Sequence, residues 1–589
     1  MGSLLLFKNH SSGVAINKSI SLFEEIGLKN PHTFKIGNWQ IWSWGKILSD
    51  EPHFIKKDKA ILICTGTPIY RNSNNLGNSL DLILNDFQQH TFDYKSIRGT
   101  YSILYSPDGN ELKIYTDQAG ISNLYFDSDE RVISTSFLAV IYGLERTVSL
   151  NKFAATEVIT SGRQIGPDTL FNEINRLEIS LRNRIGDIEV MVDKNLLDFP
   201  PEQKQSFSDS VNEQVNEIEK YFNEIRNFGN YYGVDSGLTA GHDSRMILIE
   251  LKKYFKNFQV HSFWRKSKDL ELSVAGKLAE KSGVSLKIVE GKYQLEKTEA
   301  QLEETLYKSL HFYDGHIRMH CFLMEDYHTI DHRVKILGDK KLGMNGIGGE
   351  QYRNEWHIEQ PSWSTNYFVK YALAYHISGK SFTDSAYENA YFQYLKNKLF
   401  NKLGLDAKKN RVSKKYIKKY YNEIYVASLL GIRTHAENVL GHFTTPFVDR
   451  QLTRTSYRSL PHQGISYGFQ QAMIRVMDPV LASVTSGYGY SFTHGEPLKN
   501  KIKYLVKEFT PASFYQKKLD KKACNAGNHD FKTYLNKYPL LANAVQCLRE
   551  YKIPVSENII TTRPDIMPVY LSLAYFLYYL QQKERLEKP

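Results

Sequence analysis

Residues 238–245 read LTAGHDSR, a run of small and polar residues between two segments of different character. The preceding Tyr231–Thr239 (YYGVDSGLT) is typical of a strand that enters a turn, and Ser244–Phe255 (SRMILIELKKYF) has the apolar spacing of a helix. Small residues let the backbone N–H groups of a helix N-terminus approach an anion closely. A carboxylate at Asp243 would repel a phosphate unless it held a magnesium ion. The segment therefore indicates either a metal–nucleotide site or an ordinary capped strand–turn–helix.

The same alternation continues toward the C-terminus. Gln259–Phe263 is predicted to be a strand, Asp269–Ser282 a helix and Ser285–Val289 the next strand. Strands that alternate with helices in this way predict a parallel α/β sheet. Upstream, apolar residues at helical spacing predict one helix over Ser208–Phe228, and beyond residue 360 the chain is expected to be mainly helical.

The chain before Pro200-Pro201 has strand and turn signals instead. Lys59–Thr65 is apolar and rich in β-branched residues, and Tyr101–Tyr105 and Glu111–Thr116 flank the hairpin signal PDGN at residues 107–110. These segments predict an antiparallel, sheet-rich region. We therefore expect two domains, residues 1–200 and residues 201–589.

Composition argues against a nucleic-acid-binding protein, a disulfide-linked protein and a membrane-spanning protein. The 589 residues include 75 Lys and Arg against 64 Asp and Glu, a formal charge of +11 that is spread along the chain, so we expect no nucleic-acid partner. The densest basic run, Lys408–Lys419, is interpreted as a solvated helix face or a connector. Four cysteines without paired spacing favour a reducing cytoplasm. The most apolar segment, Val569–Leu580, is too short to span a membrane and is expected to be a buried or docking helix.

A second glycine-rich segment follows at Lys341–Arg353 (KLGMNGIGGEQYR). Three glycines in four positions indicate a strained loop or a close approach by a ligand. Glu350 supplies a second carboxylate. Taken alone, this segment is as well explained by an ordinary glycine-rich turn.

Together the two segments resemble the synthetase domain of the asparagine synthetase family, which has the adenine-nucleotide α-hydrolase (PP-loop) fold. The family motif S-G-G-x-D-S is similar to Thr239–Ser244, and S-G-E-G-S-D-E is similar to Asn345–Gln351. Thr445–Asp449 (TPFVD) resembles a third family motif, R-V-P-F-L-D. Arg98–Tyr101 and the segment Leu112–Phe126 resemble the strand pair of the family's glutaminase domain.

The resemblance implies an N-terminal Ntn-hydrolase-like αββα sandwich and a parallel α/β synthetase domain with a helical C-terminal part. It also implies that ATP transfers AMP to a carboxylate, that Mg²⁺ neutralises the phosphates, and that an amine then attacks the acyl-adenylate. The expected magnesium ligands are Asp243 and Glu350. The residues expected to contact ATP and pyrophosphate are Leu238, Thr239, Ala240, Gly241, His242, Asp243, Ser244, Val260, Gly346 and Gly348.

The chain also departs from the family pattern. The family's glutaminase uses an N-terminal cysteine, whereas the sequence here begins Met1-Gly2-Ser3 and has Thr65–Thr67 where the family has an Asn-Gly turn. We therefore expect that the glutaminase activity is lost, unless the native start differs. Ile347 replaces the family's proposed general base, and isoleucine cannot accept a proton. This argues against plain ammonia-to-asparagine chemistry.

Candidates for the remaining roles are less specific. The family's late-loop lysine is absent from residues 483–490 (SVTSGYGY), so Lys501 or a neighbouring lysine could reach the site, or these could be exposed helical lysines. Arg245 could contact phosphate or lie on the helix surface. Arg318 and Arg353, together with Ile347, are the candidates for substrate contact, since arginine binds carboxylates bidentately.

The leading hypothesis is an ATP-dependent, AMP-forming ligase for a small-molecule or peptide carboxylate, with an internal, free or second-substrate amine. One alternative is a glutamine-dependent amidotransferase acting on a sugar acid or an amino acid. Another is a nucleotide-binding pseudoenzyme. We expect ATP and Mg²⁺ as cofactors and no membrane-spanning segment. A homodimer is possible on this sequence.

Overall fold

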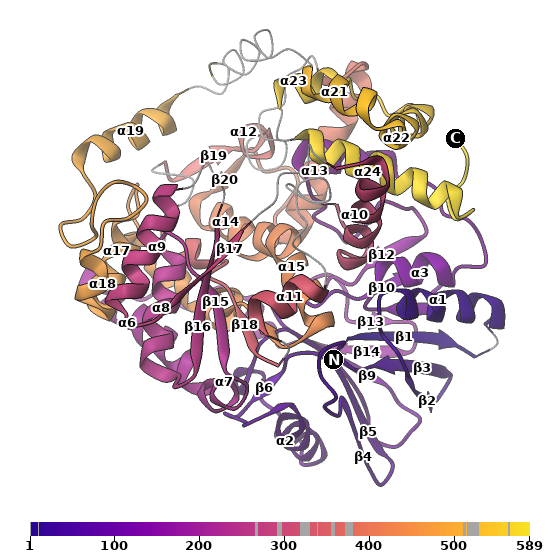
Figure 1. The fold of residues 1–589 in the computed structure, drawn as a ribbon, viewed down its shortest axis with the longest axis horizontal. Coiled ribbons are helices and arrows are strands. Elements are labelled where there is room, and N and C mark those ends of the chain that lie inside the picture. The colour runs from indigo at the N-terminus through magenta and orange to yellow at the C-terminus, as the bar shows by residue number, and fades with distance from the viewer. Residues whose placement is uncertain are drawn as a thin grey trace.

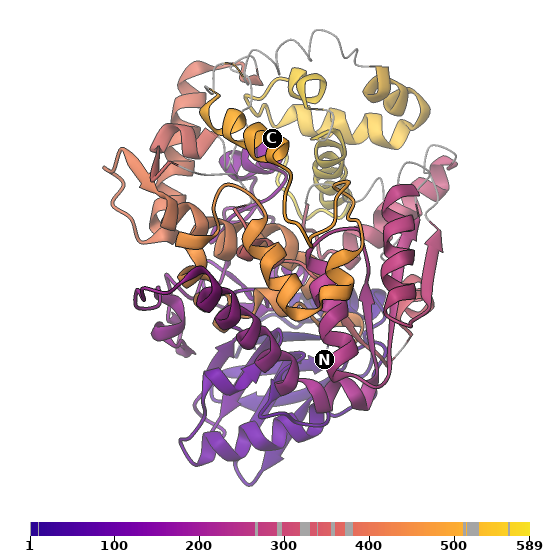
Figure 2. The same cartoon turned by 90° about the vertical axis from the view of Figure 1, so that its left-hand side faces the viewer.

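The computed structural model describes residues 2–9, 11–264, 269–290, 297–317, 330–338, 340–354, 360–370, 381–510, 514, 529–563 and 566–589. The protein is a mixed α/β structure with two six-stranded sheets near its N-terminus and a five-stranded parallel sheet further along the chain (Figure 1). The expected α/β class and the expected parallel sheet are thus confirmed. In Figure 2, the N-terminal strands lie at the bottom of the molecule and the C-terminal helices at the top.

The first sheet is antiparallel, with the strand order β12-β10-β11-β1-β3-β2. Because side chains alternate across a strand, Leu5 of β1 packs against helices α1 (Gly13–Glu25) and α3 (Phe137–Gly143), whereas Leu4 and Leu6 face the second sheet. The strands are β1 (Ser3–Lys8), β2 (His32–Ile36), β3 (Trp39–Trp44), β10 (Tyr125–Asp127), β11 (Val132–Ser134) and β12 (Ile174–Arg176).

The second sheet has the order β13-β14-β9-β8-β5-β4 and is antiparallel except between β14 and β9. The predicted hairpin is present: β8 and β9 pair across a turn in which Gly109 has a φ of +83°. Helix α2 (Leu76–Gln88) covers the outer face, where Phe87 contacts the rings of Tyr105 and Tyr115. The layers therefore follow the order helix, sheet, sheet, helix. The strands are β4 (Phe54–Lys57), β5 (Ala60–Gly66), β8 (Tyr101–Ser106), β9 (Lys113–Thr116), β13 (Arg184–Ile185) and β14 (Ile188–Met191).

The parallel sheet has the order β17-β16-β15-β18-β21. The chain starts at β15 in the middle, moves outward through β16 and β17, and returns to the other side of β15 through β18 and β21. The direction of winding therefore reverses between β15 and β18. Helices α8 (Asp243–Tyr254) and α9 (Asp269–Lys281) pack against β15 and β16. The strands are β15 (Val234–Gly237), β16 (Phe258–Trp264), β17 (Leu286–Glu290), β18 (Leu342–Met344) and β21 (Phe443–Thr444).

The prediction of a single helix over Ser208–Phe228 is wrong, because two helices occupy this region. Helix α6 (Phe207–Glu224) ends at Ile225, whose φ and ψ of −99° and 1° leave the helical range, and α7 (Arg226–Tyr232) begins after it. Ile225 and Phe228 are both fully buried in the core of the parallel sheet. The apolar spacing runs through the break because both helices pack on the same core, so the spacing does not reveal it.

The remaining described elements are mainly helical, as expected for the C-terminal part. Short two-stranded pairs are β6 (Ile69–Tyr70) with β7 (Ile97–Arg98) and β19 (Ser362–Ser364) with β20 (Arg411–Ser413). The helices are α4 (Lys152–Ser161), α5 (Lys194–Leu197), α10 (Glu299–Phe312), α11 (Ile330–Leu337), α12 (Thr365–Phe368), α13 (Ser385–Leu403), α14 (Lys414–Lys419), a π-helical segment (Tyr420–Leu430), α15 (Gly431–Leu440), α16 (Arg450–Ser456), α17 (Gly468–Met477), α18 (Pro479–Ser483), α19 (Leu498–Phe509), α21 (His529–Lys537), α22 (Pro539–Glu550), α23 (Asn558–Thr562) and α24 (Met567–Gln582).

The apolar segment near the C-terminus forms α24, which packs against α22 and α4. The prediction of a buried helix is thus confirmed. The chain after α24 returns to the N-terminal part, where Val148 and Leu586 form a parallel bridge. Within the part of the chain that the structure describes, none of the helices has both the length and the apolar character needed to cross a bilayer.

Candidate functional site

The carboxyl ends of β15 and β18 lie side by side, since the two strands pair in register from Val234–Leu342 to Ser236–Met344. Residues 238–242 leave β15 and residues 345–350 leave β18. In an open parallel sheet, a ligand crevice forms at the carboxyl edge where the strand order reverses. Both sequence motifs therefore emerge at the position where the topology favours a binding site.

Two glycines of the second loop touch the start of α8. A Cβ atom on Gly346 would lie 2.9 Å from the carbonyl carbon of Asp243 and 3.0 Å from the backbone nitrogen of Ser244. A Cβ atom on Gly349 would overlap the carboxylate of Asp243. Neither glycine has a positive φ, so the contact requires the absence of a side chain and not an unusual backbone.

The first loop is held by its own hydroxyl groups. The Thr239 N–H donates to Ser244 Oγ at 3.0 Å, and the Gly241 N–H donates to Thr239 Oγ1 at 3.3 Å. The Leu238 N–H donates to the carbonyl of His261 on the neighbouring strand at 2.7 Å. The N-cap residue of α8, His242, makes no side-chain cap, which leaves the positive end of the helix directed at the loop.

Asp243 and Glu350 share one cationic partner. One terminal nitrogen of Arg353 lies 3.3 Å from the Asp243 carboxylate and the other lies 3.3 Å from that of Glu350. From the sequence, Arg353 was expected to contact a substrate carboxylate, but in the structure it pairs with the two expected magnesium ligands. Among the described residues, no group of three or more His, Cys, Asp or Glu side chains is arranged to hold a metal ion.

Two residues that the sequence analysis did not select position this ion cluster. The amide nitrogen of Gln470 donates to the Asp243 carboxylate at 2.6 Å, and its oxygen accepts from Arg353 at 3.1 Å. Lys418 is buried and donates to the backbone carbonyls of Glu350 at 3.0 Å and Arg353 at 2.6 Å. The interpretation of the basic run as solvated is therefore wrong for Lys418. Neither residue lies in a motif, so the sequence carried no signal for them.

The two loops open on a cavity of about 400 Å³. Its wall combines polar groups from the loops with the side chains of Phe263, Leu337 and Phe443. A cavity that offers both apolar and polar surface suits a ligand with a planar apolar group and a charged group. The full lining is Gly237, Leu238, Thr239, Asp243, Ser244, His261, Ser262, Phe263, Glu271, Arg333, Ile336, Leu337, Met344, Asn345, Gly346, Ile347, Glu350, Arg433, Glu437 and Phe443.

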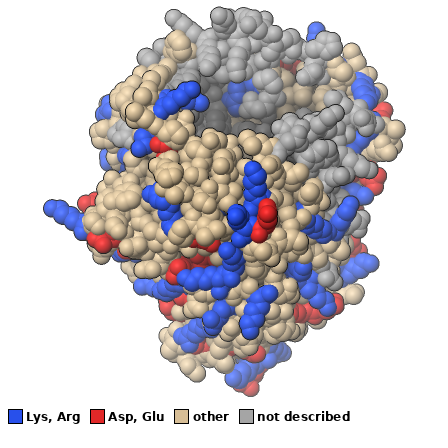
Figure 3. Space-filling view, turned by 60° about the vertical axis from the view of Figure 1, so that its left-hand side comes forward, with Lys and Arg blue, Asp and Glu red and all other residues tan. Residues whose placement is uncertain are grey.

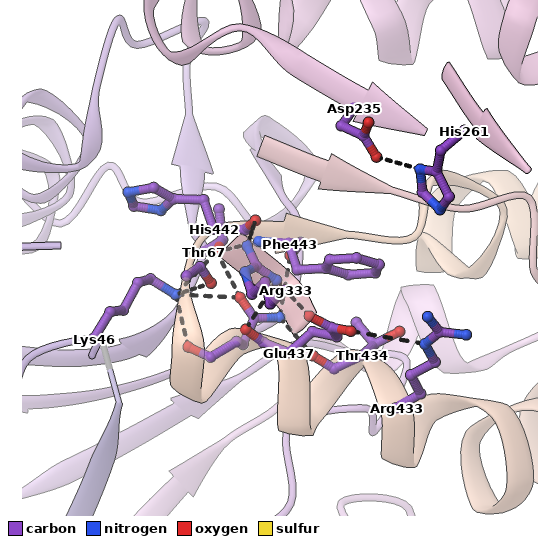
Figure 4. A network of polar contacts seen from close by, with 12 residues as sticks. Lys46, Thr67, Asp235, His261, Arg333, Arg433, Thr434, Glu437, His442 and Phe443 are labelled. Carbon is purple, nitrogen blue, oxygen red and sulfur yellow. Dashed lines mark hydrogen bonds and ion pairs between the residues drawn. The ribbon is translucent and has the colours of Figure 1, made fainter. Parts of the chain in front are cut away.

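A second charged network forms another wall of the cavity (Figure 4). Arg333 of α11 donates to the Glu437 carboxylate at 2.5 Å and to the carbonyl of His442 at 2.9 Å. Arg433 lies 3.8 Å from the same carboxylate, and its side chain is about one-third exposed (32%). Arg333, Arg433 and Glu437 were not predicted from the sequence, because they lie on helices outside the motifs.

Seven of the predicted residues line the cavity: Leu238, Thr239, Asp243, Ser244, Gly346, Ile347 and Glu350. Ile347 belongs to a small apolar cluster with Ile121 and Val448. Its side chain thus packs where the N-terminal part, β18 and residues 446–448 meet. Arg318 lies outside the described residues.

The structure does not bring Arg245 to the cavity, which corrects its expected catalytic role. The side chain is fully buried, and one terminal nitrogen donates to the carbonyls of Leu481 at 3.0 Å and Val484 at 2.9 Å. The Phe492 ring lies under the guanidinium, 4.4 Å from it. Burial lowers the pKa of Arg245 to about 10. The residue therefore ties α8 to the segment after α18.

His242 also points away from the cavity. Its ring is fully buried and stacks on Phe492 with centroids 4.3 Å apart. Burial, followed by the charges of Arg353 and Arg245, holds the pKa of His242 well below its usual value. The expected contact of His242 with pyrophosphate is therefore not supported by the geometry.

Other predicted nucleotide contacts lie beside the cavity and not in its wall. Val260 is buried within β16, and its neighbours His261, Ser262 and Phe263 line the cavity in its place. The Gly348 Cα faces the carbonyl of Phe447 across the loop. Ala240 contacts Gly487, and Gly241 is bound within the first loop.

Lys501 lies on α19 and is exposed. It is not among the residues that line the cavity. The expectation that Lys501 supplies a catalytic charge is therefore not supported by the geometry.

The third motif connects the two halves of the chain. Asp449 caps α16 by accepting the N–H groups of Gln451 and Leu452. The same carboxylate lies 3.3 Å from Arg98, which also pairs with Glu224 at 2.7 Å. The charges of these two carboxylates raise the pKa of the buried Arg98 guanidinium against the effect of desolvation. The motif thus has a structural function at the junction.

Residue 2 has no space for a side chain. A Cβ atom on Gly2 would lie 2.5 Å from the carbonyl oxygen of Gly45 and 2.5 Å from a methyl carbon of Leu28. Cys64 is fully buried, and burial raises the pKa of its thiol to about 12, so it is no thiolate nucleophile. Gly2 and Cys64 therefore both lie in tightly packed surroundings.

Lys46 fills the junction close to the turn at residues 65–67. Its ammonium donates to the carbonyls of Asn438 and Gly441, both at 2.9 Å, and lies 3.4 Å from Thr67 Oγ1 (Figure 4). Thr67 in turn donates to the Asn438 side chain at 2.6 Å. Desolvation lowers the pKa of Lys46 to about 7. These contacts join the N-terminal part to α15.

Comparison of the sequence with models of known protein families gave no match, and comparison with curated proteins gave none either.

Proposed function

We propose that the protein is an ATP-dependent, AMP-forming carbon–nitrogen ligase. It activates a substrate carboxylate as an acyl-adenylate, with loss of pyrophosphate, and an amine then attacks the acyl carbon and releases AMP. The observation that carries the proposal is the contact between the two glycine-containing loops at the reversal point of the parallel sheet. There Gly346 and Gly349 lie directly against Asp243 and Ser244, and the loops open on the cavity.

The residues present fit ATP in size and in offering both polar and apolar surface. Phe263, Leu337 and Phe443 offer an apolar slot for a base, while the loop 238–244 offers hydroxyl groups and a helix N-terminus for phosphates. The cavity of about 400 Å³ falls in the range of small-ligand sites.

The donor set also fits a magnesium ion. Asp243 and Glu350 already hold a cationic group between them, the guanidinium of Arg353. Mg²⁺ usually takes only one or two protein carboxylates and completes its shell with phosphate oxygens and water. The ion would supply charge neutralisation for the leaving pyrophosphate.

In this proposal the chain's own groups act by binding and orientation. The Ser244 hydroxyl and the first turn of α8 hold phosphate oxygens, and Gln470 and Lys418 fix the carboxylates and the turn that carries Glu350. Arg433 is the cavity cation with the greatest freedom, because its nearest carboxylate, that of Glu437, lies 3.8 Å away and already pairs with Arg333. It would contact an anionic group of the substrate. Holding both reactants in register lowers the entropic barrier to adenylation.

The N-terminal part is proposed to act as an Ntn-hydrolase-like support without glutaminase activity. Its helix–sheet–sheet–helix layering supports the fold assignment, and the turn at Thr65–Thr67, which stands where the family has an Asn-Gly turn, supports the loss of activity. The amine would then come from the substrate, from ammonia or from a second substrate. The proposed two-domain division near residue 200 follows the change from antiparallel to parallel sheets.

One observation favours a second candidate, a nucleotide-binding pseudoenzyme. Arg353 neutralises both expected metal ligands, and neither Arg245 nor Lys501 lies in the cavity wall. A protein of this kind would bind ATP without releasing pyrophosphate.

Pyrophosphate release from ATP and Mg²⁺ over a panel of carboxylates, including amino acids, sugar acids and peptides, separates the two candidates. The ligase proposal expects release with at least one carboxylate, abolished by Asp243→Asn but not by Asp81→Asn, an exposed control on α2. ATP binding measured by calorimetry without release for any carboxylate would favour the pseudoenzyme. Absence of both binding and release would refute both.

A further inference from the structure

Helix α19 exposes an apolar stripe to solvent. Its five large apolar side chains have exposed fractions between 40% and 72%, and Phe514 further along is 60% exposed. At 3.6 residues per turn, the five lie within roughly 100° of the helix surface, which is one continuous face. The α19 stripe consists of Leu498, Ile502, Leu505, Val506 and Phe509.

Lysines border the α19 stripe on both sides. Lys499 follows one edge of the stripe and Lys501 the other, and Lys503 lies further round on the side of Lys499. All three side chains are exposed. An apolar face flanked by lysines is the arrangement of a helix that lies in the interface of an anionic membrane, with the ammonium groups directed at the headgroups.

The opposite side of α19 attaches it to the protein body. Tyr504 lies away from the stripe and meets the ring of Tyr467 edge to face at 5.7 Å. Tyr467 in turn lies under the Arg353 guanidinium at 5.3 Å. Figure 1 shows α19 at the edge of the molecule. The stripe side chains are exposed, while Tyr504 connects the helix through Tyr467 to Arg353 of the ion cluster.

The side of the molecule that carries α19 is not a general basic face. In Figure 3, which brings the α19 side forward, Lys and Arg are interspersed with Asp and Glu, and wide areas of described surface carry no charge. The formal charge of +11 is therefore not gathered into one patch on this side. The lysines beside the stripe differ from the others because an exposed apolar face adjoins them.

We propose that α19 docks on the surface of an anionic lipid bilayer, with the stripe at the acyl–headgroup boundary and Lys499, Lys501 and Lys503 on the headgroups. The helix is about 18 Å long, so it lies along the surface and does not cross it. The proposal is independent of the ligase activity.

Co-sedimentation of the full chain with phosphatidylcholine vesicles, with and without phosphatidylserine, tests the proposal. We expect binding to the anionic vesicles and at least tenfold weaker binding to the neutral ones, since each lysine near an anionic surface contributes roughly fivefold. Ile502→Ser/Phe509→Ser should reduce binding about tenfold or more by removing apolar burial. Lys499→Gln/Lys501→Gln should remove most of the preference for phosphatidylserine.

Val476→Ser/Val480→Ser is the matched control, because both side chains are exposed and apolar but lie on α17 and α18. It should bind as the unmodified protein does. Equal binding of the stripe variant and the control would overturn the proposal, as would no binding to anionic vesicles. A stripe variant that converts a dimer to a monomer by light scattering, with no vesicle binding by the parent, would assign the stripe to a second copy of the chain instead.

Discussion

A terminal nitrogen of Arg353 lies 3.3 Å from the carboxylate of Asp243, where a magnesium ion was expected to bind. The other terminal nitrogen lies at the same distance from Glu350. The guanidinium thus balances two carboxylates that would otherwise repel each other. It competes with Mg²⁺ for them, because both are cations that need the same oxygens.

Arg353→Gln is expected to lower the free energy of unfolding by about 2 kcal/mol, since it removes the guanidinium charge that pairs with two partly buried carboxylates. Added Mg²⁺ should then raise the melting temperature of the variant more than that of the parent. Scanning calorimetry with and without Mg²⁺ measures this. The double variant Asp243→Asn/Arg353→Gln is the control and should lose the response to Mg²⁺. The same response in both variants would place the ion elsewhere.

Gly346→Ala tests the contact between the two loops. The new methyl group would lie 2.9 Å from the backbone of Asp243 and would push the loops apart. We expect ATP binding, measured by calorimetry, to weaken by at least about tenfold, since close approach of the backbone to phosphate depends on this contact. Gly276→Ala on α9 is the matched control, because nothing lies within 4 Å of its Cβ position. The control should bind ATP as the parent does and gain up to about 1 kcal/mol from helix propensity.

The sequence predicted those site residues whose positions follow from the strands and turns next to them in the chain. Asp243 begins the helix after β15 and Glu350 lies in the turn after β18, so the motif and the strand order together place them at one edge of the sheet. Gln470 is 227 residues from Asp243 along the chain, and its amide contact depends on how α17 packs. No local pattern encodes such a contact, which is why Gln470 and Lys418 were missed.

Arg245 illustrates the opposite error. Its position after the loop serine suggested a phosphate contact. In the folded protein, however, the side chain donates hydrogen bonds to the carbonyls of Leu481 and Val484. The first turn of a helix has residues on all sides, and sequence position does not say which side faces the cavity. The break at Ile225 was missed for a related reason, because one core continues on both sides of it.

Arg245→Met separates a structural from a catalytic function. The methionine can fill the space over Phe492, and it removes a buried charge whose Nε and second terminal nitrogen have no hydrogen-bond partner among the described residues. Replacing a buried ion by an apolar side chain of similar volume is often close to neutral. We expect the free energy of unfolding in urea to change by less than about 1 kcal/mol. Pyrophosphate release should change less than about tenfold; a loss of a hundredfold or more would restore the catalytic assignment.

Lys46 is expected to make the free energy of unfolding depend on pH, and the direction of this dependence follows from the lowered pKa of Lys46. Desolvation lowers the pKa of Lys46 from 10.5 to about 7 in the folded state. Between these values the unfolded chain binds a proton that the folded chain has released. The free energy of unfolding should therefore rise as the pH increases from about 7 toward 10, by up to about 1.4 kcal/mol per pH unit. Below pH 7 the lysine is charged in both states, and its contribution no longer changes with pH.

The matched variant is Lys46→Met, which keeps much of the side-chain volume and removes the titration. The difference in unfolding free energy between parent and variant, measured in urea from pH 6.5 to 9.5, should shift in favour of the parent as the pH rises. The carbonyls of Asn438 and Gly441 lose their donor in the variant, which adds a constant offset but no slope. A difference that does not vary with pH would mean that the Lys46 ammonium keeps its proton at the junction. In that case Glu51 and the surrounding carbonyls stabilise the charge more than burial destabilises it.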